Sequence, residues 1–247
     1  MNYPYAFRII LPLLIPILGS IGFAEEWKEF RGPDGQGRSE SMSLPLRWSE
    51  SENVTWKTPI HGDGWSSPVV ADGKIYLTTA VPIDKSEGKA RSLRAISVDA
   101  ENGEILWEQE VFRQTGDDVQ IHQKNSHASP TPVLRGERLF VHFGPSGTAC
   151  LTTDGEILWK MNDLKFSPTH GNGGSPALHG DTLIVTCDGA DQQFVAGLSS
   201  SSGEVKWRTD RRATVQKGFS FSTPTLLEVD GKMQAICPGS GAVVAYD

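Results

Sequence analysis

The sequence predicts an all-β fold, a β-propeller built from four-stranded antiparallel blades. The first observation behind this prediction is a motif, Gly103-Glu104-Ile105-Leu106-Trp107, that returns at Gly155–Trp159 and more loosely at Gly203–Trp207. The returns are separated by roughly 50 residues, which is the length of one propeller blade. The second observation is that strand and turn signals follow the same order in each interval. About four blades are expected, as part of a larger ring.

The first full unit shows this order most clearly. Its elements are expected at 66–70, at a turn 72–73, at 74–79, at 93–98 and at 104–110. The segment 74–79 alternates apolar and polar residues, as a half-buried strand does, and Asp72-Gly73 is a hairpin turn. In the motif itself, Gly103 supplies the positive φ of a tight turn, and the apolar residues that follow form a short strand.

The following units repeat the same four elements. Strands of the second unit are expected at 131–134, 139–143, 148–153 and 156–161, and those of the third at 175–178, 182–187, 194–199 and 204–209. The fourth unit has three expected strands, at 222–226, 233–237 and 242–246. Each first strand has a proline close to its start, which a sheet tolerates at a strand's first residue but not in the middle of a central strand.

One further strand is expected on its own at Asn53-Val54-Thr55-Trp56-Lys57, which resembles the end of a blade without the three strands before it. The propeller ring can close in two ways. The segment completes the unit that begins at Ser222 and closes a four-bladed ring, or it closes a blade that lies beyond Asp247. We favour the second closure, because Asp247 falls where the turns at Asp99 and Asp154 fall.

Residues 1–24 have the pattern of a secretory signal. Arg8 precedes an apolar run, Ile9–Leu18, which is too short to span a bilayer, and Gly22 and Ala24 suit the small-residue positions of a cleavage site. We expect cleavage after Ala24, a periplasmic or secreted protein, and no integral membrane span thereafter. An uncleaved membrane anchor is the alternative.

Composition fits a turn-rich β domain: the 247 residues include 26 Gly and 15 Pro, and 38% are hydrophobic. The formal net charge is −7, and no Lys/Arg cluster is longer than Arg211-Arg212. Such a chain repels phosphates, which argues against a nucleic-acid partner. The cysteines Cys150, Cys187 and Cys237 lie in or beside expected strands, where free buried thiols are favoured over a disulfide. Their spacing indicates no metal site.

The Ser-Pro strand openings, the Asp-Gly turns and the stretch Leu93–Trp107 together resemble the pyrroloquinoline-quinone-type (PQQ-type) propeller repeat. This repeat occurs in quinoprotein alcohol dehydrogenases and in the propeller lipoprotein that helps assemble outer-membrane proteins. The resemblance covers Trp48–Asp247. We therefore divide the chain into the signal, an N-terminal arm at 25–52, and PQQ-type repeats at 53–247.

Two segments are more similar to exported quinone-repeat propellers of environmental bacteria, namely Phe30–Arg38 in the arm and His170–Pro176. The chain departs from both better-known relatives. It has no adjacent cysteine pair of the kind that quinoprotein dehydrogenases carry beside the cofactor, and it has no Cys near Ala24 for lipid modification. The motifs for calcium and for a catalytic carboxylate cannot be placed.

The two faces of the propeller differ in the lengths of the connections that they carry. Tight turns fall on one face, and long loops fall on the other, at 80–92, 112–129, 162–174, 188–193 and 211–221. Long loops on a rigid scaffold commonly carry function, so we predict the binding site there. The candidate residues are His61, His127, His170, Asn172, Asp188, Asp191 and Lys217.

These candidates have two interpretations. Histidine can act as a base or a metal ligand, and the aspartates can orient it or bind a cation. Alternatively, loop His and Asp residues cap turns and bond to the backbone. Gly171, Gly173 and Gly174 either let a ligand approach the backbone or allow a sharp bend. No catalytic motif and no metal site is assigned.

The function expected from the sequence is an exported binding or scaffolding module of the cell envelope, whose long-loop face engages a protein or a small molecule. The alternative is an oxidoreductase of the alcohol or sugar dehydrogenase type that uses PQQ with Ca²⁺, with a carboxylate as the base. A third possibility is a structural half-ring that works only when joined to another chain.

Overall fold

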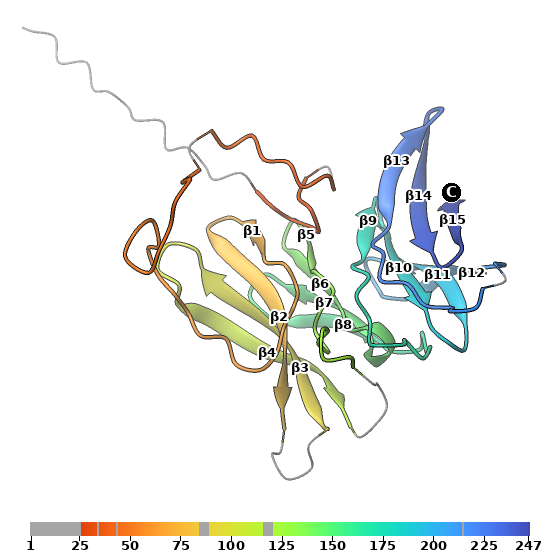
Figure 1. Ribbon diagram of the computed structural model, residues 1–247, viewed down its shortest axis with the longest axis horizontal. Coiled ribbons are helices and arrows are strands. Elements are labelled where there is room, and N and C mark those ends of the chain that lie inside the picture. Colours follow the sequence, from red (N-terminus) through yellow and green to blue (C-terminus); the bar gives the residue numbers. More distant parts are fainter. Residues whose placement is uncertain (1–25, 34, 43, 84–88, 116–120, 214) are drawn as a thin grey trace, which may run out of the picture.

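The computed structural model describes residues 26–33, 35–42, 44–83, 89–115, 121–213 and 215–247 (Figure 1). In this part of the chain, fifteen strands form four antiparallel sheets, and η1 (Gly144–Ser146) is a short 3-10 helix. The predicted all-β fold of antiparallel blades is confirmed. The expected signal peptide lies outside the described residues, and none of the described helices is long and apolar enough to span a membrane.

Three sheets have four strands each, paired in chain order. The first blade contains β1 (Val69–Ala71), β2 (Lys74–Pro82), β3 (Arg91–Asp99) and β4 (Ile105–Gln114). The second contains β5 (Val133–Arg135), β6 (Arg138–His142), β7 (Thr148–Thr152) and β8 (Ile157–Met161). The third contains β9 (Ala177–His179), β10 (Thr182–Asp188), β11 (Gln193–Ser199) and β12 (Val205–Asp210).

The fourth sheet has three strands: β13 (Thr225–Val229), β14 (Lys232–Gly239) and β15 (Ala242–Tyr246). Its first hairpin closes at Asp230 and Gly231, which have φ values of 51° and 76°. Two successive positive φ values define the type I′ turn, whose twist matches that of the flanking strands. The Asp-Gly signals therefore give the tight turns that the sequence predicts.

Buried residues from neighbouring sheets form the core. Leu93 of the first blade packs in one cluster with Leu139 of the second, while Phe140 packs in another with Leu183 of the third. A smaller third cluster includes Ala235 of the fourth sheet. Successive strand residues point to opposite faces, so the second and third blades each pack against one neighbour with each face.

The tryptophans of the repeated motif dock each blade onto the next one. Trp159 Nε1 donates a hydrogen bond to Ser200 O over 3.0 Å, and Trp107 Nε1 donates to Thr153 O over 2.9 Å. The indole of Trp159 lies directly over Gly203, where an added Cβ would come within 2.5 Å of the ring. The glycine of one motif therefore accommodates the tryptophan of the preceding blade, which explains why both return together.

The predicted strand at 53–57 is wrong, because the segment pairs with no described strand. A strand needs a partner edge for its backbone groups, and the sheet β13–β15 does not provide one here, so the four-bladed closure is not formed. Trp56 nevertheless docks as the motif tryptophans do. Its Nε1 donates to Ala100 O over 3.1 Å, and Thr58 Oγ1 donates to Gly103 O over 2.5 Å.

The N-terminal arm contacts the inner edges of the first two blades. Trp27 exchanges two backbone hydrogen bonds with Val70 of β1, at 2.8 and 2.7 Å, and Leu134 N of β5 donates to Lys28 O over 2.8 Å. The arm then turns, with Gly32 N donating to Glu29 O over 3.0 Å.

The cysteines Cys150, Cys187 and Cys237 are all buried and free. Burial raises the pKa of each thiol, to about 11 for Cys150 and Cys237. These side chains act as small apolar residues of the core.

Candidate functional site

The antiparallel order of strands sends the connections between blades to one face of the molecule. Three long interblade loops, described at 121–132, at 162–176 and at 211–213 with 215–224, lie on this face, which we call the long-loop face. The turns between first and second strands, such as Gly136-Glu137, lie on the opposite, tight-turn face. A site on the long-loop face is therefore assembled from several blades at once.

An aromatic row crosses the three interblade loops. The ring centroids of His122 and His170 are 5.1 Å apart, those of His170 and Phe219 are 5.4 Å apart, and those of Phe219 and Phe221 are 5.7 Å apart. All three contacts are edge-to-face, an arrangement that aromatic rings favour. Each of the three loops contributes at least one ring, so the row fixes the loops relative to one another.

Backbone contacts hold the centre of this row in place. His170 O accepts hydrogen bonds from His122 N, over 3.3 Å, and from Asn125 Nδ2, over 2.9 Å. His170 has a φ of 73°, in the left-handed region that is unfavourable for a residue with a side chain. Strained backbone of this kind persists only where its surroundings enforce it, and it is concentrated at functional sites.

Packing between the loops accounts for the glycines after His170. A Cβ on Gly171 would lie 2.5 Å from Ile121 Cδ1, and one on Gly174 would lie 2.8 Å from Ser222 O. A Cβ on Gly173 would lie 3.2 Å from Phe221 Cβ. Of the two interpretations from the sequence, close approach is correct, but the approaching groups belong to neighbouring loops.

A cavity of about 320 Å³ opens beside the row. We call it the loop pocket, and its lining residues are His122, Lys124, Asn125, His170, Gly173 and Phe221. Its walls are largely aromatic, with one ammonium and one carboxamide. His122 Nδ1 accepts from Lys124 N over 3.1 Å, so the ring proton of neutral His122 lies on Nε2. These groups can bind an apolar or aromatic group and orient its polar atoms.

Two predicted site residues, His170 and Asn172, lie in this region. His170 lines the loop pocket, and within the described residues its ring nitrogens make no hydrogen bond. Asn172 is 9% exposed, and its side chain packs on Gly144 and donates to Gly174 O over 3.4 Å. Asn172 therefore supports the loop from beneath.

His127 lies between the first two blades and does not line the loop pocket. Its Nδ1 is 2.7 Å from Gln114 Oε1. Burial, together with the charge of Arg91, lowers the pKa of His127, while Asp63 opposes this effect. His127 is therefore more readily neutral than a free histidine, and it links the loop after β4 to the end of that strand.

Asp188 belongs to a buried ion pair. Its Oδ1 lies 2.7 Å from Arg211 Nε, and the two side chains are 2% and 3% exposed. Arg211 also donates to Cys237 O over 2.9 Å, so the pair connects the third blade to the fourth sheet. Burial raises the pKa of Asp188, and the charge of Arg211 opposes that shift. With both carboxylate oxygens bonded to Arg211, the group has a structural role.

The remaining predicted residues lie apart from the row. Asp191 Oδ1 caps a turn, accepting from Ser167 N over 2.7 Å and from Gln192 N over 2.9 Å. His61 is an exposed residue whose Nδ1 lies 3.6 Å from Glu108 Oε2. Lys217 is exposed on the third interblade loop.

Sequence reasoning missed five residues of the row and pocket: His122, Lys124, Asn125, Phe219 and Phe221. The alternating aromatics of Gly218-Phe219-Ser220-Phe221, directly before a strand opening, were an available signal. A second aromatic residue two positions away points to the same side of an extended chain. No sequence signal shows that these rings meet His170.

The described residues do not assemble a calcium site. Among them, no group of three or more His, Cys, Asp or Glu side chains is placed to hold a metal ion. On the long-loop face, Asp188 is bonded to Arg211 and Asp191 caps a turn, whereas Ca²⁺ requires six to eight oxygen ligands.

The chain matches one family model and is similar to several solved structures. A family model described as outer membrane protein assembly factor BamB matches residues 47–148 and 91–247. The comparison with curated proteins gave no match. Among solved structures, the quinohemoprotein alcohol dehydrogenase from Comamonas testosteroni has 18% identity, covering 61% of this chain and 21% of that one, with a TM-score of 0.47.

Two further structures are similar. BamB from Moraxella catarrhalis has 18% identity, covering 74% of this chain and 46% of that one, with a TM-score of 0.44. A europium-containing methanol dehydrogenase has 17% identity, covering 62% of this chain and 25% of that one, with a TM-score of 0.44. The chain thus spans less than half of the length of each of these proteins. Because the family model matches most of its residues, the chain belongs to the family of the outer membrane protein assembly factor BamB, with PQQ-type propeller repeats.

Proposed function

We propose that the chain is an exported binding and scaffolding module of the cell envelope, which engages a protein partner through its long-loop face. The observation that carries this proposal is the aromatic row, because its rings come from three different interblade loops, and three of them, His122, His170 and Phe221, line one pocket. Partly exposed aromatic rings on a fixed scaffold are the residues that dominate protein interfaces.

The proposed location outside the cytoplasm rests on the expected signal peptide and on the family. Export requires the segment 1–24, with cleavage after Ala24, and would place the chain in the periplasm or outside the cell. The name of the matching family, an outer membrane protein assembly factor, supports an envelope location and a protein partner. The pocket combines aromatic rings with one ammonium and one carboxamide, a lining that suits the binding of a partner's side chain.

We also propose that the four sheets belong to a larger ring. The outward face of the fourth sheet exposes three apolar residues, Leu227 at 52%, Val229 at 38% and Val243 at 68%. The equivalent faces of the other blades are covered by the next sheet. The intact mass of the native protein tests this proposal: a mass near that of residues 25–247 would contradict it, and a much larger mass would support it.

Site-specific photo-crosslinking tests the long-loop face. A benzoylphenylalanine is placed at His122 on the long-loop face and, as a matched control, at Glu137 on the tight-turn face. Cells that produce the native protein should yield a discrete adduct from position 122 and none from position 137. Phe219→Ala should reduce the adduct, because it removes a ring from the row.

Two results would contradict the proposal. One is an adduct that forms only from position 137. The other is stoichiometric uptake of PQQ with Ca²⁺, followed by dye reduction with an alcohol or a sugar, which would establish the oxidoreductase instead.

A further inference from the structure

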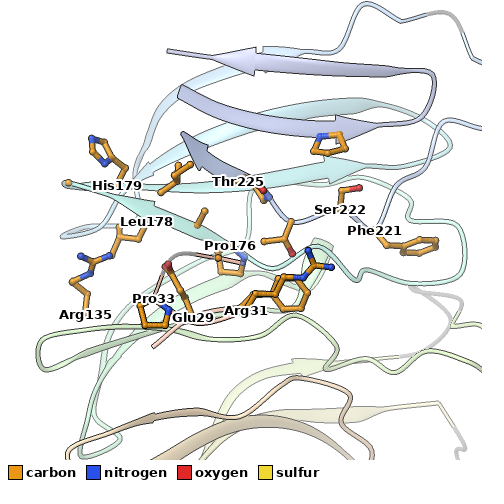
Figure 2. Close-up of a pocket in the computed structure, with 18 residues that line it drawn as sticks. Glu29, Arg31, Pro33, Arg135, Pro176, Leu178, His179, Phe221, Ser222 and Thr225 are labelled. Carbon is orange, nitrogen blue, oxygen red and sulfur yellow. The ribbon is translucent and has the colours of Figure 1, made fainter. Parts of the chain in front are cut away.

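A second pocket lies at the centre of the blade arrangement, between the N-terminal arm and the innermost strands β5, β9 and β13 (Figure 2). We call it the channel pocket, and its volume is about 540 Å³. Arg135 and His179 lie at one end of it and Phe221 at the other, with Arg31 of the arm in between. Phe221 also lines the loop pocket, so the channel pocket reaches toward the long-loop face.

The arm shows how an extended chain binds to these innermost strands. Val70 and Leu134 hold equivalent positions in their blades. Each directly precedes the last paired residue before the hairpin turn, which is Ala71 (paired with Lys74) in β1 and Arg135 (paired with Arg138) in β5. In both blades the amide at this position points away from the sheet and donates to the arm, at Trp27 O and Lys28 O.

The third blade has the same geometry without the arm. Leu178 of β9 pairs with Leu183, one position before the pair His179 and Thr182 that flanks the turn. Bonded and non-bonded pairs alternate in an antiparallel ladder, so the Leu178 amide must point to the inner edge, as those of its equivalents do. No backbone group among the described residues accepts a hydrogen bond from it. Leu178 lines the channel pocket, and it is an open edge position.

Positive charge accompanies this open edge. Arg31 and Arg135 both line the pocket, both are exposed, and neither guanidinium makes a hydrogen bond or ion pair to a described residue. Glu29 is the acidic residue of the lining. Burial raises the pKa of Glu29, while the charge of Arg135 opposes that shift. The lining therefore keeps a surplus of positive charge even when Glu29 is ionised.

We propose that the channel pocket binds an extended peptide segment of a partner protein that carries an acidic side chain. Its backbone pairs with β9 at Leu178, and its carboxylate is held by Arg31 and Arg135. The binding mode is strand addition, in which main-chain hydrogen bonds supply affinity and side-chain contacts supply specificity. Guanidinium and carboxylate are matched in shape and charge, so the arginines select acidic sequences. Apart from Phe221, this site shares no lining residue with the loop pocket.

The probe is a fluorescein-labelled acetyl-Val-Glu-Val-Glu-Val-amide peptide, added to the full chain and followed by fluorescence anisotropy. We expect saturable binding of this peptide. A peptide with lysine in place of glutamate should not bind, because it meets the same charge as the arginines. A peptide with N-methylated backbone amides should also fail to bind, because it cannot form the strand pairing.

Variants of the lining provide the second part of the test. Arg135→Ala should weaken binding about tenfold, since a charge-assisted hydrogen bond is lost, and Arg31→Gly, which suits the φ of 65° at that position, should do the same. Arg138→Ala is the matched control in the same hairpin, because that guanidinium donates to Ser200 O outside the pocket. Glu29→Gln should strengthen binding, which no loss of folding can imitate.

Several outcomes would overturn the inference. These are the absence of saturable binding, equal affinity for the N-methylated peptide, or unchanged affinity in both arginine variants. If succinate competes as well as the peptide at equal concentration, the site binds small carboxylates and the peptide proposal is wrong.

Discussion

His142 of β6 provides the most direct test of the packing between blades. The side chain is 2% exposed, its Nδ1 lies 2.9 Å from Thr148 Oγ1, and its Nε2 has no hydrogen-bond partner among the described residues. Burial lowers the pKa of His142 from 6.5 to about 4. In the unfolded chain the imidazole is charged below pH 6.5, whereas in the folded chain it stays neutral down to about pH 4.

The direction of the pH dependence follows from proton binding. Between pH 6.5 and about 4 the unfolded state holds more protons than the folded state, so the free energy of unfolding falls as pH falls. At about 1.4 kcal/mol per pH unit, this one group removes about 3 kcal/mol over that range. Above pH 6.5 it has no such effect.

The assay is urea unfolding of the native protein and of His142→Leu at several pH values from 7 to 4. Replacing the imidazole by a similar-sized apolar side chain removes the titrating group, so the native protein should lose about 3 kcal/mol more than the variant between pH 7 and 4. Parallel curves for the two proteins would refute the reasoning, whatever their separation at pH 7.

Three further predictions concern the blade junctions and the site. Asp188→Asn should lower the free energy of unfolding by about 3 to 5 kcal/mol, because it leaves the buried charge of Arg211 uncompensated; urea unfolding measures the loss. Trp159→Phe should destabilise by about 1 to 2 kcal/mol through the lost hydrogen bond to the next blade, and Trp207→Phe by less in the same assay, since no described residue accepts from its indole. His170→Gly should keep or raise the melting temperature, because glycine accepts the φ of 73°, and yet abolish the photo-adduct from the long-loop face. A lower melting temperature with an unchanged adduct would contradict that last prediction.

The sequence predicts the blades well because their determinants are local. Asp-Gly pairs impose hairpin turns, and alternation along segments such as 74–79 assigns their faces. The strand at 53–57 could not be predicted correctly, because strand formation depends on a partner edge that the segment itself does not specify. The tryptophan of this segment was still informative. Trp56 donates a hydrogen bond to the first blade, as the motif tryptophans do to theirs, although Trp56 itself is not in a strand.

The candidate site could be predicted only in outline. Loop lengths led to the prediction of the face, and His170 was named because it lies on one of the long loops. The row itself depends on three loops separated by roughly 50 residues in sequence, a distance over which pattern carries no information about contact. Asp188 was named as a possible ligand because no sequence pattern showed its partner Arg211, which lies 23 residues further on, directly after the last strand of the same blade.

The tight-turn face and the long-loop face have different roles, which explains why the residues that determine the fold differ from those proposed to bind a partner. Each motif glycine must accept the tryptophan of the preceding blade, as Gly203 accepts Trp159, so the tight-turn face is fixed by packing. The interblade loops carry no such repeated contact, and they hold the aromatic row that differs from blade to blade. A repeat detected from the first face therefore says little about the ligand bound at the second. The partner must be sought with variants of the loops, because changes in the motif act on the packing between blades.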